Sequence, residues 1–164
     1  MENKFDLTPH SFDKIRFYDC DPFGHLNNSR FLDYIMNARE IHLAQFYDFH
    51  LEQFYSQGWG WVVSSHEILY LRPAQFNETV CIQTSLIDAT DSALTVEGIM
   101  YDQHKSSMKA LLWTKFTSVD LKTGKRQPHT SEMNEFVKNL LNKEVDVDSG
   151  ITRRVKSLNQ KKPA

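Results

Sequence analysis

Apolar side chains recur at three- and four-residue steps between residues 29 and 49, a spacing that places them on one face of a helix. The positions that form this face are Phe31, Tyr34, Ile35, Ala38 and Ile41. The opposite stripe is polar and consists of Arg30, Asp33, Asn37 and Glu40. Neither Gly nor Pro interrupts the segment, so the pattern predicts one long amphipathic helix, the longest element of the chain.

After Gly60 the pattern changes from helical to strand-like. Strands are predicted at residues 61–71, 78–88, 93–102 and 108–121, and a shorter one precedes the long helix at 12–18. Because sequential strands with short links usually pair with each other, we expect an antiparallel meander.

The C-terminal part of the chain contains one more predicted helix, at residues 131–142, followed by an acidic and then a basic stretch. The sequence thus predicts a single α+β domain at residues 1–142 and a mobile tail at 143–164. One long helix covers only part of a sheet. We therefore also expect self-association through strands or sheet faces.

Composition limits the classes of function. A chain of 164 residues with 40% hydrophobic and 24% charged residues is typical of one globular domain. A net charge of −2 gives no reason to expect a nucleic-acid partner. No apolar run is long enough to cross a membrane, the first ten residues do not resemble a signal peptide, and two cysteines suit a reducing cytoplasm.

The loop at residues 19–28, between the first strand and the long helix, gathers the candidate chemistry. Asp19, Asp21 and His25 are candidates for a base or a nucleophile. Asn27 or Asn28 can cap the helix that follows. The free N–H groups at a helix start carry partial positive charge, so they can polarise a carbonyl oxygen or hold an oxyanion.

Two motifs carry a family resemblance over residues 10–130. The sequence Asp-Cys-Asp-Pro-Phe-Gly-His at 19–25, followed by a helix and later by Tyr-Leu-Arg-Pro-Ala at 70–74, resembles hot-dog-fold thioesterases of the 4-hydroxybenzoyl-CoA thioesterase type. Residues 21–28 are also similar to the Asp-x-Asn-x-His-Val-Asn-Asn motif of acyl-ACP thioesterases. The asparagine position of that motif holds Phe23, which leaves Asp21 with His25.

The resemblance implies a hot-dog fold, in which a curved antiparallel sheet wraps a long central helix, and a homodimer or homotetramer with active sites at the dimer interface. It implies hydrolysis of an acyl-CoA or acyl-ACP without a cofactor or metal. The aspartate that matches Asp21 would act as nucleophile or general base, with His25 as a second catalytic candidate. The backbone N–H that matches Asn28, next to Asn27, would bind the thioester carbonyl.

Other interpretations of these residues remain open. Asp21 could be a capping aspartate and His25 a structural histidine. Asp19, Asp21 and His25 could hold a metal ion, although no second ligand cluster accompanies them. Cys20 is a poor candidate nucleophile, because neighbouring carboxylates raise the pKa of a thiol.

The whole domain could also be a non-catalytic hot-dog protein that binds acyl groups or serves as an oligomeric scaffold. Arg39, on the flank of the long helix, is interpreted as a solvated or ion-paired residue and stays outside the site. Basic residues at 122, 125, 126, 153 and 154 are candidates for contact with coenzyme A phosphates or plain solvated surface.

Overall fold

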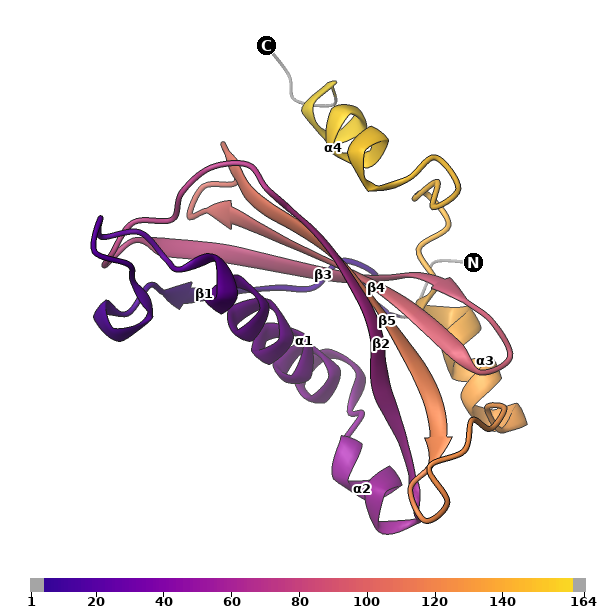
Figure 1. Ribbon diagram of the computed structural model, residues 1–164. Coiled ribbons are helices and arrows are strands. Elements are labelled where there is room, and N and C mark those ends of the chain that lie inside the picture. Colours follow the sequence, from indigo (N-terminus) through magenta and orange to yellow (C-terminus); the bar gives the residue numbers. More distant parts are fainter. Residues whose placement is uncertain (1–4, 161–164) are drawn as a thin grey trace.

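A computed structural model describes residues 5–160 as a curved five-stranded antiparallel sheet with helices on both faces (Figure 1). The strands are β1 (His10–Lys14), β2 (Trp59–Tyr70), β3 (Thr79–Ala89), β4 (Ala93–Asp102) and β5 (Met108–Asp120). The helices are α1 (Phe31–Tyr47), α2 (Leu51–Ser56), α3 (Ser131–Leu140) and α4 (Ile151–Gln160), with short 3₁₀ turns η1 (Phe17–Asp19) and η2 (Asn28–Arg30). The predicted α+β class, the long helix and the four long strands are confirmed.

The strand order is β1-β3-β4-β5-β2, which differs from the expected simple meander. Strands β3, β4 and β5 do follow one another, but β2 pairs with β5 instead of β3. Strand β1 occupies the other edge of β3, so the link after β2 crosses to the opposite side of the sheet. As a result β2 is an edge strand, and its centre is exposed.

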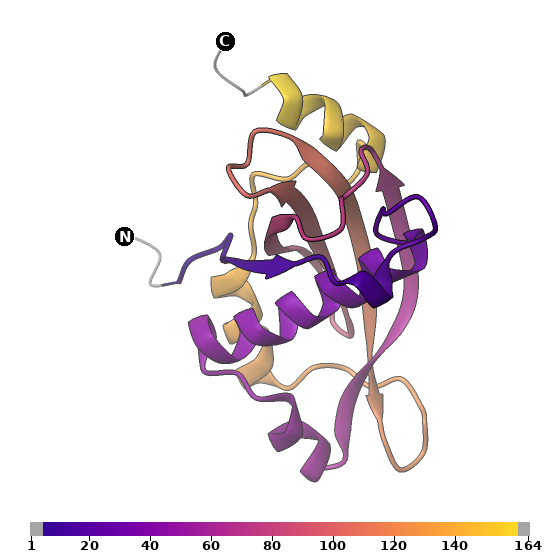
Figure 2. The same cartoon turned by 90° about the vertical axis from the view of Figure 1, so that its left-hand side faces the viewer.

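Helix α1 packs across one face of the sheet and forms the main core with it (Figure 2). Four positions of the apolar face predicted from the sequence, Phe31, Tyr34, Ile35 and Ala38, are nearly inaccessible here, whereas the fifth, Ile41, is 44% exposed. The helix comes very close to the sheet at Gly98 of β4, where an added Cβ atom would lie 2.2 Å from the Ile35 Cγ2 atom. The helix can approach the sheet this closely only because position 98 has no side chain.

Helix α4 occupies the opposite face of the sheet (Figure 1). In place of the mobile tail expected for residues 143–164, the structure has this helix with Ile151 and Val155 buried, while residues 161–164 lie outside the described residues. The helical spacing of Ile151, Val155 and Leu158 indicates this helix in the sequence. The segment has few other apolar residues, so the pattern is weak.

A buried ion pair also holds α4 on the sheet. The Arg154 guanidinium donates to both carboxylate oxygens of Glu97 on β4, with Nη2 2.8 Å from Oε1 and Nε 2.9 Å from Oε2. The Trp113 indole N–H donates to the same carboxylate at 3.0 Å. The Arg154 and Glu97 side chains are only 11% and 2% exposed, so Arg154 is a structural residue and is not free to meet a phosphate.

The contact at Gly98 gives a first prediction. Gly98→Ala should lower the free energy of unfolding by about 1–3 kcal/mol, because the new methyl group overlaps Ile35. Urea unfolding measures the change. Adding Ile35→Ala to Gly98→Ala relieves the overlap, so the double variant should be more stable than the sum of the two single changes predicts. Strict additivity would contradict this account of the packing.

The ion pair gives a second prediction. Arg154→Met leaves the Glu97 carboxylate buried without its cation, which should destabilise the docked helix by about 3 kcal/mol. Amide hydrogen exchange at Val155 should then accelerate roughly a hundredfold. Arg153→Met is the matched control, since Arg153 is exposed on the same helix and its loss should leave the exchange rate nearly unchanged. Equal effects of the two substitutions would rule out the role assigned to the pair.

Candidate active site

The loop between η1 and η2 folds back on itself as a tight turn. The Asp21 N–H donates to the His25 carbonyl at 2.7 Å, and the Gly24 N–H donates to the Asp21 carbonyl at 3.0 Å. Gly24 has a φ of +77°, a conformation that glycine adopts without strain. Asp21 and His25 are thereby held at the two ends of one short turn.

The Asp21 carboxylate is oriented by its own loop. Its Oδ1 atom accepts hydrogen bonds from the backbone N–H groups of Phe23, at 2.9 Å, and His25, at 3.1 Å. Its Oδ2 atom accepts no hydrogen bond from any residue between 5 and 160. One oxygen therefore fixes the carboxylate while the other is available to a substrate or a water molecule.

The two asparagines that follow have different roles. The Asn27 side chain caps η2, since its Oδ1 atom accepts from the Ser29 N–H at 3.1 Å. Asn28 is the first residue of η2, a position whose backbone N–H has no acceptor inside the helix. Its carbonyl accepts a hydrogen bond from the Tyr70 hydroxyl at 2.9 Å, which ties the helix start to the end of β2.

The loop and the end of β2 enclose a cavity of about 260 Å³, which we call the loop cavity. Its walls are Asp21, His25, Leu26, Asn28 and Phe31 on one side and Tyr70, Leu71, Arg72 and Pro73 on the other. Three of the four predicted site residues, Asp21, His25 and Asn28, thus share one cavity. Asn27 lies outside its lining and acts through the cap. The second wall could not be assigned from the sequence, because it depends on where β2 ends in space.

The Asp19 side chain connects the loop to Tyr34 of α1 and to Arg30. Its Oδ2 atom accepts from the Tyr34 hydroxyl at 2.8 Å, and its Oδ1 atom lies 3.8 Å from the Arg30 Nε atom. Burial is the main reason why the pKa of Tyr34 is raised to about 12, so this phenol stays protonated and donates a hydrogen bond to Asp19. Asp19 is therefore a positioning residue.

Cys20 is a poor nucleophile in this setting. Burial raises the pKa of its thiol, and the charges of Asp21 and Asp19 raise it further. The thiol donates to the Arg16 carbonyl, with Sγ 3.3 Å from the oxygen. Among residues 5–160, no group of three or more His, Cys, Asp or Glu side chains is arranged to hold a metal ion.

The chain matches the family model described as the thioesterase-like superfamily over residues 15–141. The chain belongs to this superfamily. The resemblance found in the sequence and the hot-dog fold expected from it are confirmed. A search of curated protein sequences finds no match. Over residues 5–160, no helix has the length and apolar character needed to cross a membrane.

Several solved structures share the fold of this superfamily member. Slr0204, a 1,4-dihydroxy-2-naphthoyl-CoA thioesterase from Synechocystis, is 15% identical, with a TM-score of 0.72 over 85% of this chain and 99% of its own. YbaW, a probable thioesterase from Escherichia coli, is 23% identical, with a TM-score of 0.70 over 81% and 98%. The 12:0-ACP thioesterase from Umbellularia californica is 12% identical, with a TM-score of 0.74 over 88% and 55%.

The anchoring role of Asp19 can be measured. Asp19→Ala leaves the partly buried Tyr34 hydroxyl with only the Lys14 carbonyl, 3.5 Å away, as an acceptor, so the free energy of unfolding should fall by about 1–3 kcal/mol. The amides of Asp21 and Leu26 should also exchange faster. Asp33→Ala is the control, because Asp33 forms an exposed pair with the same Arg30 and should cost under about 1 kcal/mol. A loop that stays equally protected in both variants would exclude Asp19 as its anchor.

Proposed function

We propose that the protein hydrolyses the thioester bond of an acyl-CoA or acyl-ACP, with Asp21 as nucleophile or general base. One observation carries the proposal: Asp21, whose carboxylate has one oxygen that accepts no hydrogen bond from residues 5–160, lines the loop cavity together with Asn28, the first residue of η2, whose backbone N–H has no acceptor inside the helix. A thioester needs these two groups, one to act on the carbonyl carbon and one to stabilise its oxygen. Membership of the thioesterase-like superfamily supports the same reaction.

The geometry suits two routes to the same products. In the first, Asp21 attacks the carbonyl carbon and expels the thiolate, and water then hydrolyses the resulting acyl–aspartyl anhydride. In the second, Asp21 takes a proton from a water molecule that attacks the carbonyl carbon directly. Both routes consume one water and release a free acid and a thiol.

Two further residues assist in this proposal. The carbonyl oxygen of the substrate binds at the Asn28 N–H, where the start of the helix adds partial positive charge. Asn27 holds that N–H in place through its cap on Ser29. His25, which also lines the cavity, delivers a proton to the departing thiolate.

The active form that we propose is a homodimer or a homotetramer. Three large apolar side chains near Asp21, those of Phe17, Tyr18 and Phe23, are 78%, 86% and 81% exposed. Large apolar side chains that are this exposed are usual where a second subunit packs. A partner at this surface would also close the loop cavity to bulk water, which strengthens the electrostatic effects on the thioester.

Asp21→Asn is the direct test. The amide can neither attack the carbonyl nor accept a proton, so kcat should fall at least about a hundredfold while KM changes little. Release of free thiol is followed with a panel of short-chain, long-chain and aromatic acyl-CoAs, and the best substrate serves for the variants. Asp33→Asn, an exposed aspartate in the first turn of α1, should keep full activity.

Full activity of Asp21→Asn would refute the assignment of Asp21. If the native protein turns over neither any acyl-CoA nor an acyl-ACP, the other hot-dog role applies, that of an acyl-binding protein without catalysis.

A further inference from the structure

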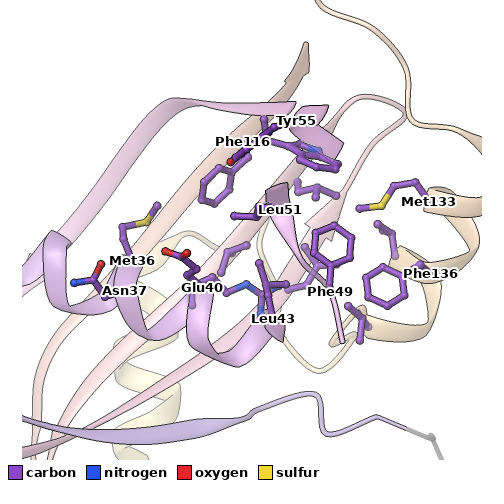
Figure 3. Close-up of a pocket in the computed structure, with 17 residues that line it drawn as sticks. Met36, Asn37, Glu40, Leu43, Phe49, Leu51, Tyr55, Phe116, Met133 and Phe136 are labelled. Atoms are coloured by element: carbon purple, nitrogen blue, oxygen red, sulfur yellow. The ribbon is translucent and has the colours of Figure 1, made fainter. Parts of the chain in front are cut away.

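A second cavity, which we call the α1–α3 cavity, has a volume of about 210 Å³ and lies between the C-terminal part of α1, the sheet, α2 and α3 (Figure 3). It shares no lining residue with the loop cavity. Its walls are mainly apolar and aromatic and include Leu43, Phe49, Trp61, Phe116, Phe136 and Val137. Phe49 and Phe136 stack on each other with their ring centroids 5.2 Å apart.

Arg39 forms part of this wall and is only 8% exposed. Its Nη1 atom lies 3.5 Å from the Thr84 Oγ1 atom, and its Cζ atom lies 5.9 Å from the centroid of the Tyr47 ring. No carboxylate from residues 5–160 lies within 4.0 Å of the guanidinium. The interpretation of Arg39 as a solvated or ion-paired residue is therefore wrong for the described part of the chain.

Among residues 5–160, no carboxylate forms an ion pair with Arg39 to compensate its charge. Burial, followed by the charge of Arg39 itself, lowers the pKa of His42 to about 4, so this imidazole is neutral at pH 7. Glu40 lines the same cavity but is exposed on α1, where water screens its charge. Arg154 differs from Arg39 in this respect, because its Nε and Nη2 atoms both donate to the buried Glu97 carboxylate.

We propose that the α1–α3 cavity binds an apolar carboxylate, whose charged end pairs with Arg39 and whose hydrocarbon or aromatic part lies against Phe116 and Phe136. A buried guanidinium is costly without an anion, and a carboxylate matches its planar array of N–H donors. A cavity of about 150 Å³ is known to hold benzene, so the space here accommodates an aromatic ring or a medium-length alkyl chain. Neither the ion pair with Arg39 nor the apolar contact with Phe116 and Phe136 involves Asp21.

Calorimetric titration of the full-length protein with matched acid and alcohol pairs tests whether the negative charge of the ligand contributes to binding. Octanoate is compared with 1-octanol, and 4-methylbenzoate with 4-methylbenzyl alcohol, so that each pair differs in charge while the apolar part is kept. At least one acid should bind about tenfold or more tightly than its alcohol. The pair with the larger difference tells whether the cavity prefers an alkyl chain or an aromatic ring.

Variants locate the binding to this cavity. Arg39→Gln should reduce the affinity for the acid to that for the alcohol, whereas Arg39→Lys should keep part of the preference. Leu94→Trp places a large side chain in the cavity and should abolish binding of both members of the pair. Asp21→Asn should bind the acid as the native protein does, which separates this site from the proposed catalytic one.

Three results would overturn the inference. The first is equal affinity of the native protein for acid and alcohol in both pairs, which would make the cavity a site for neutral apolar molecules. The second is no binding of either acid at millimolar concentration. The third is an unchanged preference for the acid in Arg39→Gln, which would place the carboxylate elsewhere. Circular dichroism of each variant checks that it is folded before titration.

Discussion

The direct packing of α1 on β4 at Gly98 is the constraint on which both cavities depend. Ile35 lies against the strand because position 98 has no side chain, and this contact fixes the helix on the sheet. Towards its N-terminus the helix then carries η2 and the loop to the end of β2, where Tyr70 meets Asn28. Towards its C-terminus it passes over Val96 of the same strand, and there the α1–α3 cavity opens.

Much of the fold and part of the site could be predicted because the information is local. The apolar face of α1 and the strand-like runs after Gly60 follow from side-chain periodicity, which needs no knowledge of tertiary structure. Asp21, His25 and Asn28 lie within one loop, so their proximity follows from the sequence itself. The cap formed by Asn27 follows from residue type at a helix start.

The features that were missed depend on contacts between distant segments. The pairing of β2 with β5 brings residues 70–73 to the loop cavity, and nothing near them in sequence specifies that pairing. Glu97 is buried because α4, which is distant in sequence, covers it and pairs it with Arg154. Nothing in the sequence distinguishes Arg39 from Arg154. Arg154 is buried beside the Glu97 carboxylate, whereas Arg39 is buried without a carboxylate partner among residues 5–160. Burial of a charge is a tertiary property.

Helix α4 also bears on how copies of this chain can assemble. It covers the face of the sheet opposite α1, a face that a second subunit would otherwise be free to pack against. Because α4 is tethered to the sheet, its local concentration there is on the order of millimolar, well above that of a separate molecule at ordinary dilution. In an oligomer of the kind proposed above, α4 would therefore compete with a second subunit for this face, and association would be directed towards the exposed edge of β2 and towards the exposed side chains of Phe17, Tyr18 and Phe23.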